Sequence, residues 1–362
     1  MVAQEGKKIR VLIVDDSAFM RKIISDILKT DTDIEVVATA RNGKDGLEKA
    51  IALQPDIITL DLEMPVMNGL EALVELMKLK PVPKVIILSN LRYEDGDAVV
   101  NALEIGAIDY VAKPTRLLME HHAEQIREEL INKIKLICRS KATYYPQIKS
   151  EYKRVSDVKK YSIESKSETS LKYIIAIGAS TGGPKALQEV LTKLPMNIPA
   201  AILVVQHMPP GFTKSLAKRL DSLSRIGVKE AEDGDILIPG RAYIAPGNHH
   251  MLIEKYMDNE YKISLNKEAP ENGHRPSVST MMKSVAETGH KNIIAVIMTG
   301  MGNDGSDGML KIKEAGGRTI AQDESTCVVY GMPKAAVNIG AIDTIAPLHD
   351  IKTEILKRMG VL

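Results

Sequence analysis

Short apolar runs alternate with helical patterns throughout the first 138 residues, and this alternation limits the possible folds more than any other feature of the chain. The apolar runs have the length of buried strands. They predict strands at residues 9–14, 34–39, 56–60, 84–88 and 108–111. The segments that follow them predict helices at residues 18–29, 44–53, 69–79, 95–105 and 117–138. Five βα units in succession favour a parallel sheet that helices cover on both faces.

A polar segment at residues 139–171 interrupts this pattern. Large aliphatic residues are sparse there, while Lys, Ser, Glu and Tyr dominate, a composition typical of a linker. A loop of this length would be unusual inside one compact domain. The sequence therefore predicts two domains, 1–138 and 172–362, joined by this linker.

The alternation resumes in the second half of the chain, with strands predicted at residues 173–178, 200–206, 292–298 and 318–322. Residues 228–265 have a different pattern, because their apolar runs flank the turn at 256–260 and indicate short antiparallel strands. We expect a doubly wound, mainly parallel α/β domain with an antiparallel β-hairpin insertion.

The composition of the chain excludes several classes of protein. The chain has 362 residues, a formal net charge of +1 and two cysteines, Cys138 and Cys327. A net charge so close to zero implies no general attraction to nucleic acid or anionic lipid. Two cysteines do not form a disulfide framework, and a chain without one suits a reducing compartment. No apolar run approaches the ~20 residues that cross a bilayer, and the N-terminus has no signal-peptide core. We expect a cytoplasmic monomer that neither binds nucleic acid nor inserts into membranes.

Polar residues follow four of the five strands predicted in the first half: Asp15 and Asp16, Asp61, Ser89, and Lys113. In a sheet of order 2-1-3-4-5, ligands bind at the carboxyl ends of the strands, where the strand order reverses. Three neighbouring carboxylates need a cation, and an all-oxygen set suits Mg²⁺. A carboxylate can also attack phosphorus, with the lysine and the serine hydroxyl binding the phosphoryl oxygens. Each acid alone is more often a solvated loop residue, but the set of five favours a functional site.

Residues 8–125 resemble the receiver domain of two-component response regulators. The motifs that carry the resemblance are VLIVDDSAFMR (11–21), DLEMPVMNGL (61–70), LSN (88–90) and DYVAKP (109–114). The resemblance implies a flavodoxin-like fold, a histidine kinase as phosphodonor and Asp61 as the residue that is phosphorylated. It also implies a Thr or Ser at the position of Ser89 and a cis bond between Lys113 and Pro114. The Mg²⁺ ligands that it implies are Asp15, Asp16, Asp61 and the backbone carbonyl of Glu63.

The stretch IGASTGGPKAL (177–187) joins a strand to a helix and allows two interpretations. A dinucleotide-binding G-x-G-x-x-G has glycine where Ser180 stands, and it requires an acidic residue between Glu189 and Asp221, where none occurs. Pro184 likewise breaks the frame of a phosphate-binding P-loop. The same residues satisfy G-x-S-x-G, in which a sharp turn exposes a nucleophilic serine. A plain turn in which Ser180 caps the next helix remains the alternative.

A nucleophilic serine requires a base and an acid that orients it. His207 directly follows the apolar strand 200–206, and Asp304 and Asp307 lie in the glycine-rich loop after strand 292–298. These strand ends lie at the same rim of the predicted sheet as Ser180, which favours a Ser180–His207–Asp304 triad. Asp304 could instead merely cap a helix at 304–316. The chain order Ser-His-Asp differs from that of α/β-hydrolases, so the scaffold is a different one.

Residues 172–350 resemble the catalytic domain of the chemotaxis protein-glutamate methylesterases, the CheB family. The motifs are IGASTGGP (177–184), VVQHMPPGFTKSLAKRLD (204–221), GRAYIAPGNHH (240–250), RPSV (275–278), MTGMGNDG (298–305) and VVYGMPKAA (328–336). The resemblance implies Ser180 as nucleophile, His207 as base and Asp304 as its orienter. It also implies that Thr181 and Met301 line the site, Met301 near the oxyanion hole.

The implied substrates are methylated glutamates on chemoreceptors, with deamidation of glutamines at the same site and no cofactor in the catalytic domain. The domain order further implies that the receiver covers this site until Asp61 is phosphorylated. One departure is Ser279, where the family commonly has Asp; altered receptor contacts are a hypothesis for this change.

Two other classes of protein fit the sequence less well. A DNA-binding response regulator would need a helix-turn-helix or a basic stripe after the linker, but residues 172–362 show βα units and near-neutral charge. A nucleotide-binding module is disfavoured by Pro184 and by the missing acidic residue.

Overall fold

The computed structural model describes residues 8–90, 92–113, 116–140, 171–257 and 260–361, and the chain divides into two compact units, 1–149 and 150–362. Most of the predicted linker, residues 141–170, lies outside the described residues. Pro114 lies outside them too, and with it the predicted cis bond to Lys113.

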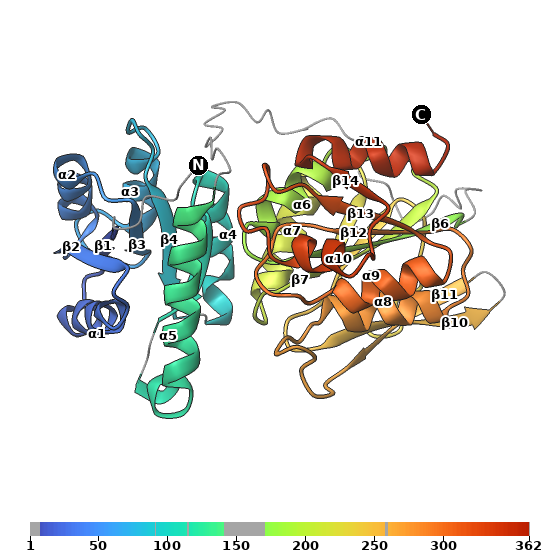
Figure 1. Ribbon diagram of the computed structural model, residues 1–362, viewed down its shortest axis with the longest axis horizontal. Coiled ribbons are helices and arrows are strands. Elements are labelled where there is room, and N and C mark those ends of the chain that lie inside the picture. Colours follow the sequence, from blue (N-terminus) through green and yellow to red (C-terminus); the bar gives the residue numbers. More distant parts are fainter. Residues whose placement is uncertain (1–7, 91, 114–115, 141–170, 258–259, 362) are drawn as a thin grey trace. The chain divides into compact units, whose positions relative to one another are not determined.

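The first unit contains one parallel sheet of five strands in the order β2-β1-β3-β4-β5 (Figure 1). The strands are β1 (Ile9–Val14), β2 (Ile34–Ala40), β3 (Ile57–Asp61), β4 (Lys84–Ser89) and β5 (Asp109–Ala112). The helices are α1 (Ala18–Lys29), α2 (Gly43–Leu53), α3 (Gly69–Leu76), α4 (Gly96–Ile105) and α5 (Arg116–Arg139), with a short 3₁₀ helix η1 (Tyr93–Asp95) before α4. Contacts pair α1 with α5 and link α2, α3 and α4 in a row, so helices cover both faces.

The predicted sheet order and element order of this unit are confirmed. The predicted boundaries agree to within one residue except at the end of α3, which stops at Leu76 instead of residue 79. There the amides of Lys78 and Leu79 donate to carbonyls three residues back, Glu75 and Leu76, and this tighter turn ends the helix. Residues 11–14 of β1 are all buried, as expected for a strand with helices on both faces.

The second unit contains a sheet of seven strands in the order β14-β13-β12-β6-β7-β9-β8, and every neighbouring pair is parallel. The strands are β6 (Tyr173–Ala179), β7 (Ala200–Gln206), β8 (Gly227–Glu230), β9 (Arg241–Ile244), β12 (Ile293–Ile297), β13 (Arg318–Gln322) and β14 (Thr344–Ala346). The helices are α6 (Gly183–Leu191), α7 (Phe212–Leu223), α8 (Val278–Glu287), α9 (Ser306–Glu314), α10 (Met332–Asn338) and α11 (Leu348–Arg358).

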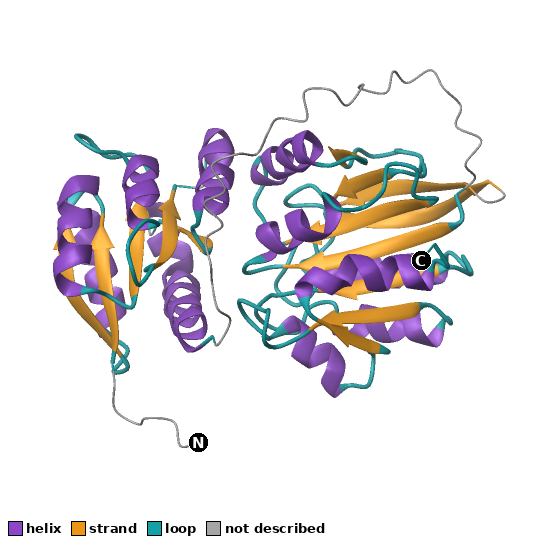
Figure 2. Ribbon diagram, turned by 90° about the horizontal axis from the view of Figure 1, so that it is seen from above, coloured by secondary structure: helices purple, strands orange, loops and turns teal. Residues whose placement is uncertain are grey.

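An antiparallel hairpin of β10 (His250–Met257) and β11 (Glu260–Asn266) packs against α8, as Figures 1 and 2 show. The predicted hairpin insertion is thus confirmed, but the antiparallel interpretation of the whole region 228–265 was wrong. β8 and β9 are parallel members of the main sheet. Three of the four residues of β9 are buried, because β9 lies between β7 and β8 and not at a solvent-facing hairpin. The short edge strand β14 was not predicted.

The strand order places a switch point between β6 and β12. From β6 the chain proceeds to β7 and β9 on one side, and it later returns to β12, β13 and β14 on the other side. In such sheets, ligands bind outside the carboxyl ends of the strands at the point where the order reverses. The carboxyl ends of β6, β7 and β12 therefore define the region where a site is expected.

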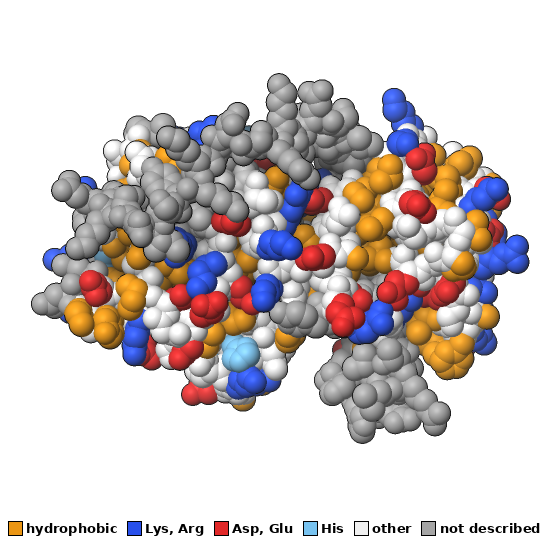
Figure 3. Space-filling view, turned by 180° about the vertical axis from the view of Figure 1, so that it is seen from behind, with side chains coloured by type: hydrophobic (Ala, Val, Ile, Leu, Met, Phe, Trp, Pro, Cys, Tyr) orange, Lys and Arg blue, Asp and Glu red, His pale blue; other side chains and the backbone are white. Residues whose placement is uncertain are grey.

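Charged side chains of both signs are interspersed on the face that Figure 3 shows, in keeping with the net charge of +1. Among the described helices, none combines the length and the apolar character needed to cross a membrane.

Candidate functional site

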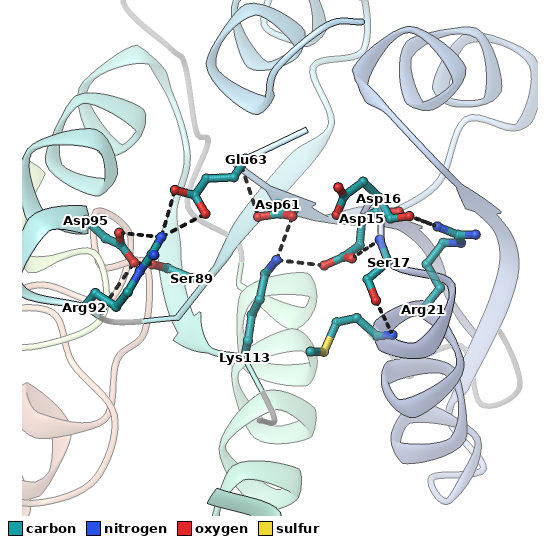
Figure 4. A network of polar contacts seen from close by, with 11 residues as sticks. Asp15, Asp16, Ser17, Arg21, Asp61, Glu63, Ser89, Arg92, Asp95 and Lys113 are labelled. Carbon is teal, nitrogen blue, oxygen red and sulfur yellow. Dashed lines mark hydrogen bonds and ion pairs between the residues drawn. The ribbon is translucent and has the colours of Figure 1, made fainter. Parts of the chain in front are cut away.

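In the first unit, three carboxylates meet at the carboxyl ends of β1 and β3 (Figure 4). One carboxylate oxygen from each of Asp15, Asp16 and Asp61 lies within 4.8 Å of the other two. Asp15 and Asp61 are buried, whereas Asp16 is exposed. The predicted acidic cluster therefore forms and has one side open to solvent.

Lys113, which follows β5, is the counter-charge to the two buried acids. Its Nζ lies 3.0 Å from Asp15 Oδ2 and 2.6 Å from Asp61 Oδ2. Burial lowers the pKa of Lys113, but hydrogen bonds and charge interactions with the two carboxylates outweigh it and raise the pKa overall. Burial raises the pKa of Asp61, and the hydrogen bond from Lys113 only partly offsets this. The lysine therefore remains charged beside the acids.

These residues fit a magnesium ion. Three carboxylates against one ammonium leave an excess of negative charge in a largely buried space, and Mg²⁺ prefers such oxygen ligands. The amide of Glu63 donates to Asp61 Oδ1 at 3.2 Å, which fixes the backbone of Glu63 beside the cluster.

Ser89, at the end of β4, belongs to a neighbouring network that the sequence did not predict. Its hydroxyl donates to Asp95 Oδ2 at 3.2 Å, and that oxygen also accepts from the backbone amide of Arg92. The Arg92 guanidinium donates to both carboxylate oxygens of Glu63, at 2.8 and 2.9 Å. Figure 4 shows this chain of contacts crossing from the loop after β4 to the loop after β3. Arg92 and Asp95 were not predicted as site residues, because neither of them directly follows a strand.

In the second unit, Ser180 directly follows β6 on a sharp turn. Its amide donates to the carbonyl of Thr299 at 3.0 Å, and its carbonyl accepts from the amide of Gly183 at 2.7 Å. Gly182 has a φ of 76°, a left-handed conformation that favours glycine. A Cβ on Gly183 would collide with the side-chain oxygen of Gln206. Gly182, the last residue of the G-x-S-x-G sequence, and the following Gly183 thus allow the turn that begins α6.

The loop after β12 packs closely on this turn. A Cβ on Gly300 would lie only 2.8 Å from the Cβ of Ser180. Thr181 is buried, and its carbonyl accepts from the hydroxyl of Thr299 at 2.8 Å. Among the described residues, the backbone amides of Thr181 and Met301 have no protein acceptor. The turn at Ser180 and the loop after β12 thus each offer one backbone amide, that of Thr181 and that of Met301, as a donor to a ligand.

His207 follows β7, the strand next to β6, and its amide donates to the carbonyl of Ala179 at 3.2 Å. Its Nε2 lies 2.8 Å from Oδ2 of Asp304. A neutral imidazole that donates its Nε2–H to a carboxylate carries its lone pair on Nδ1. Nδ1 is thus the nitrogen that is able to accept a proton.

Asp304 is held by the N-terminus of α8. Its Oδ1 accepts from the hydroxyl of Ser277 at 2.9 Å and from the amide of Ser279 at 3.0 Å, and its Oδ2 accepts from the amide of Val278 at 2.7 Å. Burial raises the pKa of Asp304, but the hydrogen bonds from His207 and these amides outweigh it and hold the pKa well below its usual range. Asp304 thus accepts hydrogen bonds from the N-terminus of α8, whose N-cap residue is Ser277, and it does not cap the helix that follows it, since the N-cap residue of α9 is Gly305.

Ser279 is fully buried beside this acid. Its hydroxyl accepts from the amide of Gly305 at 2.8 Å, while its own amide donates to Asp304. The residue that departs from the resembled family therefore contacts the loop that carries Asp304, and it does not lie on the surface.

Comparison with known proteins gives matches to both units. A family model described as CheB methylesterase matches residues 175–355, and one described as response regulator receiver domain matches residues 11–122. A protein-glutamate methylesterase/protein-glutamine glutaminase of Pyrococcus horikoshii is 44% identical over 357 residues, 99% of this chain and 95% of that relative.

A Syntrophomonas wolfei protein named protein-glutamate methylesterase/protein-glutamine glutaminase 1 is 46% identical over 97% of this chain and 99% of its own length. The crystal structure of the Thermotoga maritima CheB methylesterase catalytic domain is similar to 52% of this chain and 98% of that one, with 48% identity and a TM-score of 0.50.

Proposed function

The chain belongs to the CheB methylesterase family and carries a response regulator receiver domain in its first half. We propose that it hydrolyses γ-methyl esters of glutamate side chains on chemoreceptors. It is a protein-glutamate methylesterase with protein-glutamine glutaminase activity, like the relatives that match nearly its whole length. Its receiver domain is residues 1–138, its linker 139–171 and its catalytic domain 172–362; the matched ranges 11–122 and 175–355 lie inside the two domains.

The observation that carries this proposal is the pair of His207 and Asp304 beside the Ser180 turn. The two side chains are 2.8 Å apart, and the histidine side chain is only 9% exposed. Ser180 and His207 end adjacent strands that pair in register from residue 173 to 179. A serine, a base and an oriented acid at one sheet rim are the groups that acyl transfer requires.

The reaction follows from these groups. Ser180 Oγ attacks the ester carbonyl while Nδ1 of His207 takes its proton, and Asp304 stabilises the imidazolium that forms. The amides of Thr181 and Met301 donate to the developing oxyanion. Methanol leaves with the proton from His207, and water then attacks the acyl-enzyme with His207 again as base. With glutamine as substrate, ammonia leaves instead and the product is the same carboxylate.

In the receiver domain, Asp61 accepts the phosphoryl group, and Lys113 and Ser89 bind its oxygens. Asp15, Asp16, Asp61 and the carbonyl of Glu63 would hold Mg²⁺, which neutralises charge on the phosphoryl group when bound. A chemotaxis histidine kinase is the phosphodonor, and the protein acts in the cytoplasm as a monomer. The unphosphorylated receiver lowers the methylesterase activity by covering the catalytic site, and phosphorylation relieves this inhibition.

Methanol release from methylated receptor membranes tests the catalytic assignment. We expect Ser180→Ala to lower the rate by several orders of magnitude. Ser222→Ala is the matched control, because Ser222 is an exposed serine on α7 of the same unit. Substantial activity in Ser180→Ala would exclude Ser180 as the nucleophile.

The same assay tests regulation by the receiver. A small-molecule phosphodonor should accelerate the wild type and leave Asp61→Asn unchanged, and the fragment 172–362 should be faster than the unphosphorylated full chain. A fragment no faster than the full chain would contradict inhibition by the receiver.

A further inference from the structure

The base of the proposed triad has a second histidine stacked on it. The imidazole rings of His207 and His274 have centroids 3.8 Å apart and planes inclined by only 9°. His274 does not follow a predicted strand and lies outside the motifs, so the sequence did not predict a role for it. Its ring covers one face of His207, while Asp304 contacts the Nε2 edge of the same ring.

His274 is held in place by a two-residue turn. Glu271 and His274 exchange both backbone hydrogen bonds, at 3.1 and 2.9 Å, and the residues between them are Asn272 with φ 52° and Gly273 with φ 78°. Asn-Gly with two positive φ values is the preferred sequence for a type I′ turn. The local sequence therefore fixes the backbone from which the ring projects.

The residues that flank the ring are anchored as well. The guanidinium of Arg275 donates to the side-chain oxygen of Asn248 at 3.0 and 2.6 Å and to the carbonyls of Lys267 and Glu268. These hydrogen bonds join the turn to the loop before β10 and to the residues that follow β11. The ring of His274 is thus carried by a segment fixed from both sides.

The turn is also attached to α8. The carboxylate of Glu271 accepts from the hydroxyl of Thr280 at 2.5 Å and contacts the ammonium of Lys283, both on α8. The N-terminus of the same helix holds Asp304. One helix therefore fixes both groups that contact His207, the acid at its edge and the ring on its face.

We propose that His274 is a positioning residue that fixes the ring plane of His207 for proton transfer. The hydrogen bond that Nε2 donates to Asp304 fixes one edge of the imidazole. A tilt of the ring plane about that edge would change the direction of Nδ1, the atom proposed to take the proton of Ser180. A parallel ring at 3.8 Å opposes the tilt, because the two faces lose contact when one plane rotates. The inference rests on the proposed function of Ser180 and His207, but not on the identity of the substrate.

Three substitutions of His274 in the full chain separate stacking from other roles. His274→Phe keeps a flat ring without polar atoms, His274→Asn keeps polar atoms without a ring, and His274→Ala keeps neither. Because misplacement by about 1 Å can cost ~100-fold in rate, we expect Ala and Asn to lower kcat by roughly 10- to 100-fold with KM within twofold. Phe should restore kcat to within about threefold of wild type.

The readouts are methanol release and the rate at which a fluorophosphonate labels Ser180, with thermal unfolding by circular dichroism to compare the fold of each variant. Rescue by Asn but not by Phe would overturn the proposal, because polar contacts would then matter and not the ring face. Equal rates in all four proteins, or equal losses in all three variants with unchanged unfolding midpoints, would also overturn it. If the wild type is labelled but releases no methanol, the proposed substrate fails, while the labelling rates still test His274.

Discussion

Asp304→Asn is the substitution for which the structure makes the most detailed prediction. The carboxylate accepts two hydrogen bonds at each oxygen: from Ser277 and Ser279 at Oδ1, and from Val278 and His207 at Oδ2. An asparagine has one oxygen and one NH₂ group. In either orientation the NH₂ group faces a backbone amide, that of Ser279 or that of Val278, and the buried amide loses its acceptor.

The expected loss of stability follows from these contacts. A buried donor without an acceptor costs about 1–3 kcal/mol, and loss of the negative charge at the N-terminus of α8 adds about 0.3–1 kcal/mol. We expect the second unit of Asp304→Asn to be less stable by roughly 1–4 kcal/mol. Calorimetry of the full chain measures this as a lower temperature for one of its unfolding transitions.

The expected loss of activity has a separate cause. If the NH₂ group faces His207, the histidine donates from Nδ1 and no longer has a lone pair for Ser180. If the oxygen faces His207, the imidazolium lacks its counter-charge. Either outcome should lower kcat for methanol release by roughly 10²- to 10⁴-fold.

The pH dependence of stability provides a further test. The folded-state pKa of Asp304 lies below its value in the unfolded chain, which is ~3.9. Its contribution to stability is therefore complete above that unfolded value and is lost as pH falls through the folded pKa. The part of the stability difference between wild type and Asp304→Asn that comes from ionised Asp304 should shrink as pH falls below about 4.

Asp307→Asn is the matched control, because Asp307 is an exposed acid in the first turn of α9. It should leave both kcat and the unfolding transitions nearly unchanged. The reasoning is refuted if Asp304→Asn matches this control in stability, or if its kcat stays within about threefold of wild type.

Three shorter predictions concern other contacts. Gly300→Ala would place a Cβ 2.8 Å from that of Ser180; we expect fluorophosphonate labelling to slow at least tenfold, and an unchanged rate would show that the loop can move aside. Ser279→Ala removes the acceptor of the buried Gly305 amide, so calorimetry should show the second unit destabilised by about 1–2 kcal/mol; an equal or higher transition temperature contradicts this. Chelation of divalent cations should prevent phosphorylation of Asp61 by a small phosphodonor; phosphorylation that persists in excess chelator would exclude the proposed Mg²⁺ site.

The central strands of the main sheets were predictable because each is a largely continuous apolar run that is buried on both faces. β7, all of whose residues are buried, is the clearest case. β8 and β9 could not be assigned in the same way. Each has only four residues. The sequence of so short a strand is the same kind of sequence whether the strand pairs within a hairpin or joins a distant parallel strand. β9 pairs with β7 and β8 pairs with β9, and local sequence does not encode this choice of partners.

The strand-end rule brought Ser180, His207 and Asp304 to one rim of the sheet, because that rule depends only on topology. The groups that hold them were not predictable in this way. Ser277 and His274 come from the segment before α8, and their position depends on how that helix docks against the sheet. The Asn272–Gly273 pair is a visible turn signal, but nothing in its sequence indicates which side chain the turn places against the base.

Burial of Asp304, the proposed catalytic acid, explains why a helix terminus contacts it. A carboxylate removed from water is costly unless donors and positive charge replace its hydration. A neutral His207 gives Asp304 one donor, whereas the N-terminus of α8 gives it two amides and the favourable end of a helix dipole. The amides of the helix therefore add to the contact with His207 in keeping the acid ionised. Because the same helix anchors Glu271, and through it the turn that carries His274, a shift of α8 would displace the acid and the stacked ring together. If His207 is the base that we propose, its orientation depends on how this one helix docks, and substitutions that loosen α8 should lower the rate of acyl transfer.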